Sequence, residues 1–184
     1  QIVMEGWQFA TNIITIESEG YIIAGYCNDT SGSFDAFLIK TDSLLHIEWI
    51  KNYGGESFDV IMDIHQTSDG NVAFAGYSES DAIGQDDIWV GLTDIDGNLL
   101  WEKKIGTVNS EMAFSIQQTS DENLIIAGNR GSFVSGQGNR DAMLLKMNLS
   151  GEIIWQKFYN STGNHSEWGI AVTETTDGCF LLVG

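Results

Sequence analysis

The sequence predicts an all-β fold built from a repeated four-stranded antiparallel unit, and two regular spacings support this prediction. The segment 66–76 (QTSDGNVAFAG) returns as 118–128 (QTSDENLIIAG), and looser copies lie at 18–25 and 176–184. The glycine that ends this segment recurs at positions 25, 76, 128 and 184, and a tryptophan recurs at positions 49, 101 and 155. Both spacings give a period of about fifty residues, which is typical of repeat architectures.

The second repeat shows how local signals predict each strand in turn. An apolar segment at 60–66 is followed by a Ser-Asp-Gly turn, a second segment at 71–77 and a longer polar loop. A third segment at 87–93 and a fourth at 99–105 flank the turn Asp96-Gly97-Asn98. Asp-Gly between apolar, β-branched and aromatic residues is the strongest short-range hairpin signal. Four strands joined by two tight turns and one longer loop are therefore expected, and no helix is indicated.

Four antiparallel strands in a repeat of about fifty residues predict a β-propeller, whose blades are sheets of this kind. A β-solenoid or a β-sandwich competes, but solenoid coils are shorter and a sandwich does not repeat at a fixed step. The expected blade repeats are approximately 5–55, 56–107, 108–160 and a partial one at 161–184. These 14 strands make about three and a half blades, whereas a closed ring needs roughly 4 to 8. We therefore expect either a fragment of a larger ring or a ring completed by another copy. Two copies would supply 28 strands, enough for a seven-bladed ring.

The repeated tryptophans are expected to pack one blade against the next. Trp101 and Trp155 lie four residues after a turn glycine, on the outermost strand of the blade, and Trp49 has the same place although its turn lacks the glycine. A tryptophan that lies across a neighbouring blade buries ~200 Å² and contributes up to about 5 kcal/mol before entropy is subtracted. We therefore assign these three residues a structural role.

The chain is strongly acidic, with a formal net charge of −18 from 8 Lys and Arg against 26 Asp and Glu. Such a surface repels phosphate, so nucleic acid is not an expected partner, whereas cationic partners, Ca²⁺ or simple solubility are all compatible with it. Cys27 and Cys179 are too few and too far apart for a disulfide framework or a structural zinc site. No apolar run approaches the ~18 residues of a membrane span, and no signal peptide opens the chain.

The repeat motif resembles that of the secreted bacterial and archaeal β-propeller repeat proteins. The resemblance rests on Gln-Thr-Ser-Asp-Gly-Asn, Ala-Gly-Tyr, an Asp before an apolar strand, Asp-x-Asp-Gly-Asn and Trp-x-Lys, and it spans essentially the whole chain. The segment 97–101 is also similar to the tryptophan-docking motif of quinoprotein propellers. The first resemblance implies a prokaryotic protein of the extracellular space or cell envelope, usually without enzymatic activity.

Because neighbouring strands of an antiparallel sheet run in opposite directions, alternate connections lie at the same end of the sheet. This strand parity predicts which loops share one end of the molecule. The tight turns at 68–70 and 96–98 lie at one end of the sheets. The longer connections lie at the other end: those between strands two and three at 28–34, 78–86 and 129–140, and those between repeats at 106–110 and 160–165. Variable loops on a rigid scaffold are the usual place for binding. We expect any binding face at the end that carries the long connections.

Acidic residues recur at this same end and are candidates for binding Ca²⁺, which takes oxygen ligands. Asp35, Asp87 and Asp141 precede the third strand, and Asp59, Glu111 and Glu167 precede the first. A separate run, Asp29-x-Ser31-x-Ser33-x-Asp35, alternates oxygen-bearing side chains like part of a calcium loop. The favoured alternative is structural, because a carboxylate at a strand start commonly accepts hydrogen bonds from loop amides and fixes the loop.

No catalytic motif was found in the chain: it has no Gly-x-Ser-x-Gly elbow, phosphate loop or metalloprotease motif, and its three histidines lie in different parts of the repeat. No cofactor is expected, apart from the Ca²⁺ alternative. The sequence favours a non-enzymatic scaffold that presents one loop face to a protein, a glycan or a surface. Two alternatives stay open: part of a glycan-active or quinone-dependent propeller enzyme whose active site comes from several blades, and a spacer in a long surface protein.

Overall fold

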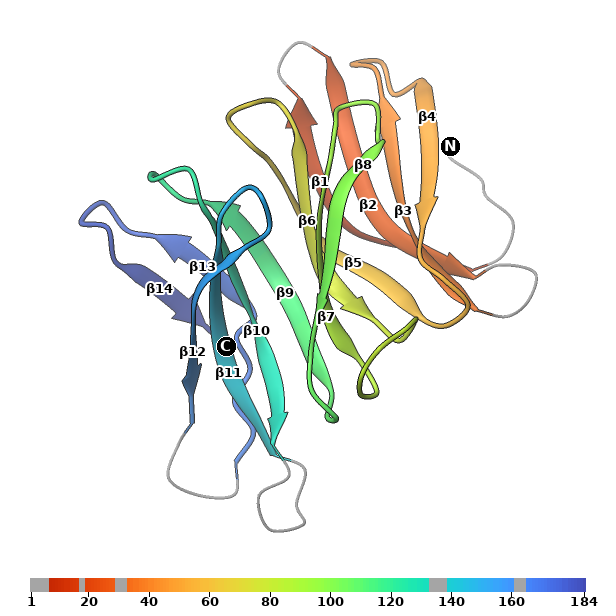
Figure 1. The fold of residues 1–184 in the computed structure, drawn as a ribbon. Coiled ribbons are helices and arrows are strands. Elements are labelled where there is room, and N and C mark those ends of the chain that lie inside the picture. The colour runs from red at the N-terminus through yellow and green to blue at the C-terminus, as the bar shows by residue number, and fades with distance from the viewer. Residues whose placement is uncertain (1–6, 17–18, 29–32, 133–138, 161–164) are drawn as a thin grey trace.

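The computed structural model of this chain describes residues 7–16, 19–28, 33–132, 139–160 and 165–184 (Figure 1). These residues form strands and their connections only, as the sequence predicted. No helix, and hence no helix able to cross a membrane, occurs among them. All neighbouring strands within a sheet are antiparallel and follow one another in chain order.

The strands form three four-stranded sheets and one two-stranded sheet. The first sheet contains β1 (Gln8–Ile16), β2 (Gly20–Asn28), β3 (Phe34–Thr41) and β4 (Ile47–Tyr53), and the second contains β5 (Asp59–Gln66), β6 (Val72–Ser78), β7 (Asp87–Thr93) and β8 (Leu99–Ile105). The third contains β9 (Glu111–Gln118), β10 (Leu124–Ser132), β11 (Asn139–Met147) and β12 (Ile153–Tyr159), and the fourth contains β13 (Ala171–Glu174) and β14 (Phe180–Val183). The repeated four-stranded antiparallel unit is therefore confirmed, and in the second sheet every strand boundary lies within one residue of the prediction.

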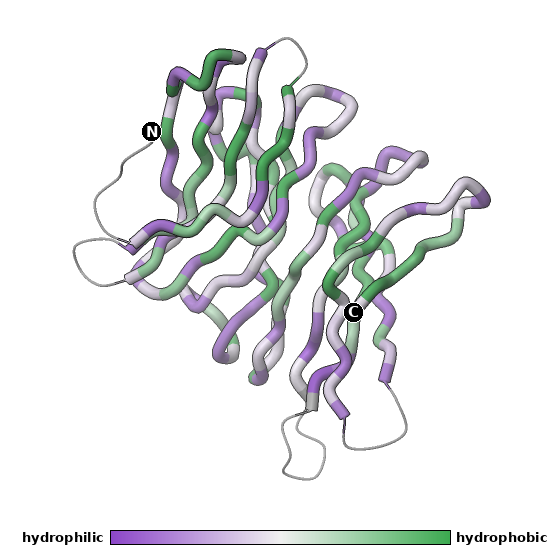
Figure 2. Tube along the Cα trace, turned by 180° about the vertical axis from the view of Figure 1, so that it is seen from behind, coloured by the Kyte–Doolittle hydropathy of each residue, from purple (hydrophilic) through white to green (hydrophobic). Residues whose placement is uncertain are grey.

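The sheets pack face to face in chain order. Each central strand turns alternate residues to its two neighbouring sheets, so Phe74 and Trp89 of the second sheet pack with Leu38 of the first. Ala75 and Val90, on the opposite face, pack with residues of the third sheet. A further apolar cluster joins the third sheet to the fourth. Figure 2 shows the hydrophobic residues concentrated along the strands, as these shared cores require.

A β-bulge recurs in the first strand of each four-stranded sheet and links neighbouring sheets. The register shifts between residues 10 and 12 of β1, 61 and 63 of β5, and opposite Ala127/Gly128 in β9. The Asp63 carboxylate, just after its bulge, accepts hydrogen bonds from Asn12 Nδ2 in β1 and from the Ile116 amide in β9, the latter at 2.8 Å. Burial raises the pKa of Asp63, although the Ile116 and Ile64 amides oppose this effect. One carboxylate thus connects three consecutive sheets.

The turn between the first two strands of a sheet repeats with the same side-chain bonds. Thr67 Oγ1 donates to Asp69 Oδ1 at 2.6 Å, and the Thr119–Asp121 and Thr175–Asp177 pairs repeat this bond at 2.5 Å. These bonds favour the ionised carboxyl group. The Thr67 hydroxyl lowers the pKa of Asp69, the Thr175 hydroxyl lowers that of Asp177, and Lys146 followed by Thr119 lowers that of Asp121.

These turn aspartates predict a loss of stability in acid. Because their pKa values in the folded chain lie below the ordinary value of 3.8, their contribution is present above about pH 4 and is lost as the pH falls further. The midpoint of thermal unfolding, measured between pH 7 and pH 3, should fall most steeply below pH 4. Asp121→Asn should lose fewer degrees than the wild type over that interval, and an equal loss would contradict this assignment.

A left-handed backbone position in the same turn predicts a stabilising substitution. Gly70 and Gly178 have φ of 87° and 78°, whereas Glu122 holds the equivalent position at 61°. A side chain costs about 1 kcal/mol in this conformation. Glu122→Gly should therefore raise the free energy of unfolding by about 1 kcal/mol in urea titrations.

Gly70→Ala is the matched control, because a Cβ at Gly70 would have no neighbouring atom within 4 Å and would test the backbone alone. It should lower the free energy of unfolding by about 1 kcal/mol. Changes of the same sign in the two variants would contradict the proposed strain.

Candidate functional site

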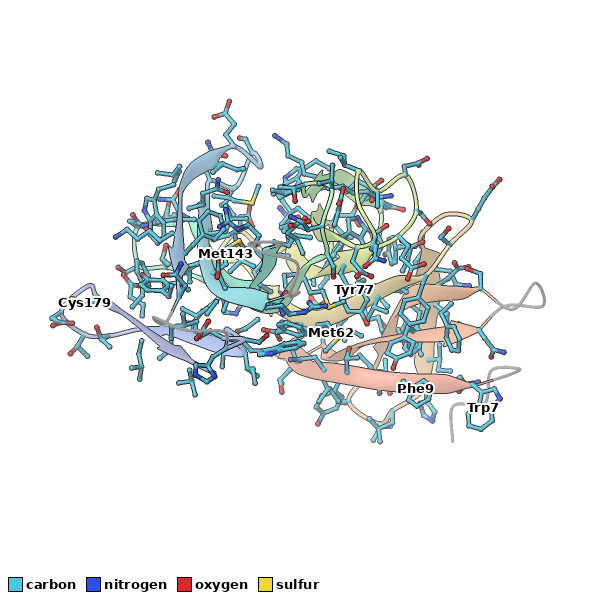
Figure 3. The ribbon with its side chains drawn as sticks, turned by 90° about the horizontal axis from the view of Figure 1, so that it is seen from below. Trp7, Phe9, Met62, Tyr77, Met143 and Cys179 are labelled. Atoms are coloured by element: carbon cyan, nitrogen blue, oxygen red, sulfur yellow. The ribbon has the colours of Figure 1, made fainter. Side chains whose placement is uncertain are left out.

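The strand order places the connections at the two ends of the sheets as predicted. Five-residue hairpin turns such as 67–71 and 94–98 lie at one end, whereas the connections at the other end vary, with five residues at 54–58 and eight at 79–86. One end of the sheets carries the connections between strands two and three and those between consecutive sheets, including 54–58, 79–86 and 106–110. We call this end the loop face. The opposite end carries the tight turns, including 67–71 and 94–98, and we call it the turn face. Figure 1 shows the loop face at the lower end of the sheets, and Figure 3 views the molecule from that side.

Buried carboxylates hold the connections of the loop face. Asp59 Oδ2 accepts hydrogen bonds from the Gly55 amide and the Ser80 hydroxyl, both at 2.7 Å, and Oδ1 accepts one from the Ser78 hydroxyl. Asp59 thereby ties the connection 54–58 to the connection 79–86. All its bonds are to neutral donors of the chain, which is the arrangement expected of a carboxylate that fixes loops.

Asp87 and Glu111 hold two further connections in the same way. The Asp87 carboxylate accepts the Ile83 amide at 2.9 Å, four residues earlier in the chain. The Glu111 carboxylate accepts the Thr107 amide at 2.7 Å and the Thr107 hydroxyl at 2.8 Å. Because Asp87 and Glu111 are buried as well, these connections are held in a defined shape before any ligand arrives.

The remaining acidic candidates are placed separately. Asp141 pairs with Arg130 at 3.0 Å, and the Glu167 amide donates to the Arg140 carbonyl at 2.8 Å. Asp35 lies in β3, and Ser33 Oγ donates to the Ser57 carbonyl at 2.6 Å. Asp29 and Ser31 lie outside the described residues. Within the described ranges, no group of three His, Cys, Asp or Glu side chains is arranged to hold a metal ion.

The predicted packing residues lie between consecutive sheets. Trp101 Nε1 donates to the Leu149 carbonyl in the next sheet at 2.9 Å. The Trp49 ring lies so close to Gly97, in the turn of the second sheet, that a Cβ there would come within 2.9 Å of it. The Trp155 ring centroid is 5.9 Å from that of Phe180 in the fourth sheet.

A pocket of about 240 Å³ opens between the second and third sheets. Its apolar lining includes Ile88, Ile105, Met143 and Phe158, and its polar lining includes Glu111 and Arg130. The Arg130 guanidinium lies over the Phe158 ring, 3.7 Å from its centroid, while it pairs with Asp141. This end of the third sheet therefore contains a guanidinium held between an aromatic ring and a carboxylate.

The second arginine of the chain lies at the same end of the third sheet. Arg140 donates to Asn129 Oδ1 at 2.9 Å and to Ser110 Oγ at 3.3 Å, and its guanidinium lies 4.9 Å from the Trp168 ring centroid. Asn129 is fully buried, and its Nδ2 has no hydrogen-bond partner in the described part of the chain. Both arginines of this acidic chain thus lie at the loop face, each over an aromatic ring.

An aromatic cluster lies at the loop face of the first and second sheets. Its five members are Phe9, Tyr26, Phe34, Phe58 and Tyr77. Consecutive ring centroids are 5.0 Å apart for Phe9 and Tyr26, 5.8 Å for Tyr26 and Phe34, 5.1 Å for Phe34 and Phe58, and 6.1 Å for Phe58 and Tyr77. Phe9 stays 43% exposed, and Figure 3 shows Phe9 and Tyr77 on the side of the molecule that faces the viewer.

Acidic side chains lie near the Tyr77 end of this aromatic cluster. Burial first, and then the Tyr26 hydroxyl and the carboxylates of Asp86 and Glu79, raise the pKa of Tyr77 to about 12. Partial burial and the neighbouring Asp86 and Asp59 carboxylates raise the pKa of Glu79. Among the described residues, no Lys or Arg forms an ion pair with Glu79 or Asp86. The Tyr77 end of the cluster therefore lies beside carboxylates that have no cationic partner in the described part of the chain.

The turn face also has a hollow, which the sequence did not indicate. A groove of about 450 Å³ lies beside the turn 67–71 and is lined by Glu19, Asp69 and Asp94 among others. These carboxylates already have partners in the chain: Glu19 pairs with Lys40 at 3.2 Å, Asp69 accepts the Thr67 hydroxyl, and Asp94 accepts the Asn98 amide at 2.8 Å. The aromatic and guanidinium groups of the loop face have no counterpart among its lining residues.

The sequence reasoning located the loop face but missed its aromatic cluster and its two arginines. A signal was present, because Tyr26 and Tyr77 follow the recurring glycines, and Phe34 and Phe58 precede the recurring acids Asp35 and Asp59. Comparison with known protein families gives no match, and no curated protein matches the sequence.

Proposed function

We propose that the chain is an arc of a β-propeller, in which the sheets are consecutive blades. Support comes from how closely the backbones approach. β5 lies against the first sheet, β9 against the second and β13 against the third. β4, β8 and β12 instead reach the next sheet through the long side chains of Trp49, Trp101 and Trp155. Sheets that approach at their first strands and separate at their fourth are arranged like blades around an axis. The repeat resemblance supports the same fold and an extracellular or envelope location.

Exposed apolar residues at both ends of the arc support a larger ring. In β14, Phe180 and Leu182 pack toward the third sheet, so Leu181 and Val183 face away from it and are 54% and 55% exposed. In β1, Ile14 and Ile16 pack toward the second sheet, and Ile13 is exposed. Apolar sheet faces of this kind are normally covered in the assembled protein. Further blades, from the same polypeptide or from a second copy, are the proposed cover.

Within this fold, the function we propose is non-enzymatic binding of a partner through the loop face. The observation that supports it is the combination of connections fixed by buried carboxylates with partly exposed aromatic and guanidinium groups at the same end of the sheets. Loops held in one shape reduce the entropy that binding would otherwise cost. Aromatic residues and arginine are the side chains most enriched where proteins bind partners.

A binding screen with two matched variants tests this proposal. The wild type is applied to a glycan array and to a displayed peptide library, and the same glycans are assayed for hydrolysis. Phe9→Ala removes an exposed apolar side chain from the loop face, and Leu44→Ala removes one, 75% exposed, from the turn face. We expect binding without turnover, weakened by Phe9→Ala and unchanged by Leu44→Ala. Turnover without stable binding, or weakening by Leu44→Ala alone, would contradict the proposal.

A further inference from the structure

The aromatic cluster offers a surface rather than a cavity. Centroid separations of 5.0 to 6.1 Å leave no room for a ligand between the rings. The cluster draws its members from β1, β2, β3, β6 and the connection before β5, so it extends across the loop ends of two sheets. A partly exposed aromatic surface of this kind suits a macromolecular partner, because binding there covers area instead of filling a hole.

The charges around the cluster select the sign of the partner. The Glu79 amide donates to the carbonyl of Phe58, a member of the cluster, at 2.8 Å. The carboxylates of Asp86 and Glu79 both raise the pKa of Tyr77, and Glu56 and Asp81 are exposed in the same connections. Lys104 also lies at this end of the second sheet, where its ammonium donates to the Ser80 carbonyl. A cation that reached this surface would meet ring faces and carboxylates together, and both attract it.

The third sheet already contains this combination within the chain itself. Arg130, which is two residues after the recurring Gly128, lies over the Phe158 ring and pairs with Asp141. At the equivalent places of the first two repeats, Cys27 and Ser78 follow Gly25 and Gly76. The first two sheets therefore provide rings and carboxylates at this end of the molecule, but they provide no arginine of their own.

We infer that the aromatic cluster of the first and second sheets is a docking surface for an arginine-bearing segment of a partner protein. The inference rests on the proposed function and names the partner's chemistry. Guanidinium suits the surface better than ammonium, because its planar group stacks on an aromatic ring and still donates two parallel hydrogen bonds to a carboxylate. Binding should weaken with added salt, since part of the attraction is between opposite charges.

The test uses a fluorescent arginine-rich peptide, its lysine counterpart, its glutamate counterpart and a neutral oligosaccharide, with affinities from anisotropy and calorimetry at two salt concentrations. Glu79→Gln removes one carboxylate of the surface, and Phe9→Leu replaces one ring by an apolar side chain without aromatic character. Asp96→Asn is the matched control, because it removes one exposed carboxylate from the turn face and changes the net charge of the chain by the same amount.

We expect the arginine peptide to bind most tightly, and the Glu79→Gln and Phe9→Leu variants to bind it about 3- to 10-fold more weakly. Asp96→Asn should leave its affinity within about twofold of the wild type. Equal weakening by Asp96→Asn and Glu79→Gln would show attraction to net charge alone and overturn the inference. Binding of the neutral oligosaccharide at the loop face, without the arginine peptide, would overturn it and leave the proposed function standing. If the screen also finds no loop-face ligand, both fail.

Discussion

Replacing Phe74 with alanine is expected to lower the free energy of unfolding by about 3–5 kcal/mol. The side chain is fully buried between the first and second sheets. Its ring makes an edge contact with Trp89, with centroids 5.0 Å apart, and lies 6.1 Å from the Tyr53 centroid. It also fills the space above Gly91, where a Cβ would come within 2.2 Å of the ring. Truncation would leave a cavity that these stiff strands cannot close.

Urea unfolding of Phe74→Ala and Phe74→Leu measures this effect. Leucine keeps most of the apolar volume, so Phe74→Leu should lower the free energy of unfolding clearly less than Phe74→Ala does. Both variants should keep the wild-type dependence of unfolding free energy on urea, because the same surface is exposed on unfolding. A loss below about 1 kcal/mol for alanine would mean that the two sheets do not share the core described here.

Replacing Asp59 with alanine is expected to lower the free energy of unfolding by about 3 kcal/mol, because buried donors lose a charged acceptor. The Gly55 amide and the Ser78 and Ser80 hydroxyls all bond to this carboxylate. Since the side chain ties two connections together, their amides should also exchange hydrogen faster in the variant. Thermal unfolding and hydrogen exchange check the two effects.

Asp59→Asn keeps the volume of the side chain and one carbonyl oxygen, so it should lower the free energy of unfolding by less than Asp59→Ala does.

Calcium addition distinguishes the structural role of Asp59 from the alternative of a metal ligand. On the structural account, millimolar Ca²⁺ leaves the unfolding midpoint of the wild type unchanged. A midpoint that rises with Ca²⁺ in the wild type but not in Asp59→Ala would contradict this account.

The strands were predictable because their signals are local. The Asp-Gly turns at 69–70 and 96–97 and the apolar segments around them lie within a few residues of each other, and β5 to β8 begin and end within one residue of the prediction. The left-handed conformation of Glu122 was not predictable from propensity, because the fold imposes it where other repeats have glycine. The bulges that point Asn12 and Asp63 toward neighbouring sheets likewise depend on contacts between sheets.

The candidate site was predictable only in part, for a related reason. The order of strands alone determines which connections share one end of an antiparallel sheet. The connections of the loop face and their recurring acids could therefore be assigned to one end from the sequence. The partners of those acids differ between repeats, although the acids recur at the same place: Asp87 accepts hydrogen bonds from amides of its own connection, whereas Asp141 pairs with Arg130 of the neighbouring strand. The aromatic cluster joins residues from Phe9 to Tyr77, and only the packing of two sheets brings them together.

Nuclear magnetic resonance can map where a ligand binds, and it therefore tests whether the loop face is the binding surface. The ¹⁵N-labelled chain is titrated with the arginine-rich peptide and, separately, with the strongest ligand from the glycan and peptide screen. We expect amide shifts to change around Phe9, Tyr26 and Phe58 with the peptide, and within the loop face with either ligand. Changes confined to the turns 67–71 and 94–98, or no change with either ligand, would contradict this expectation.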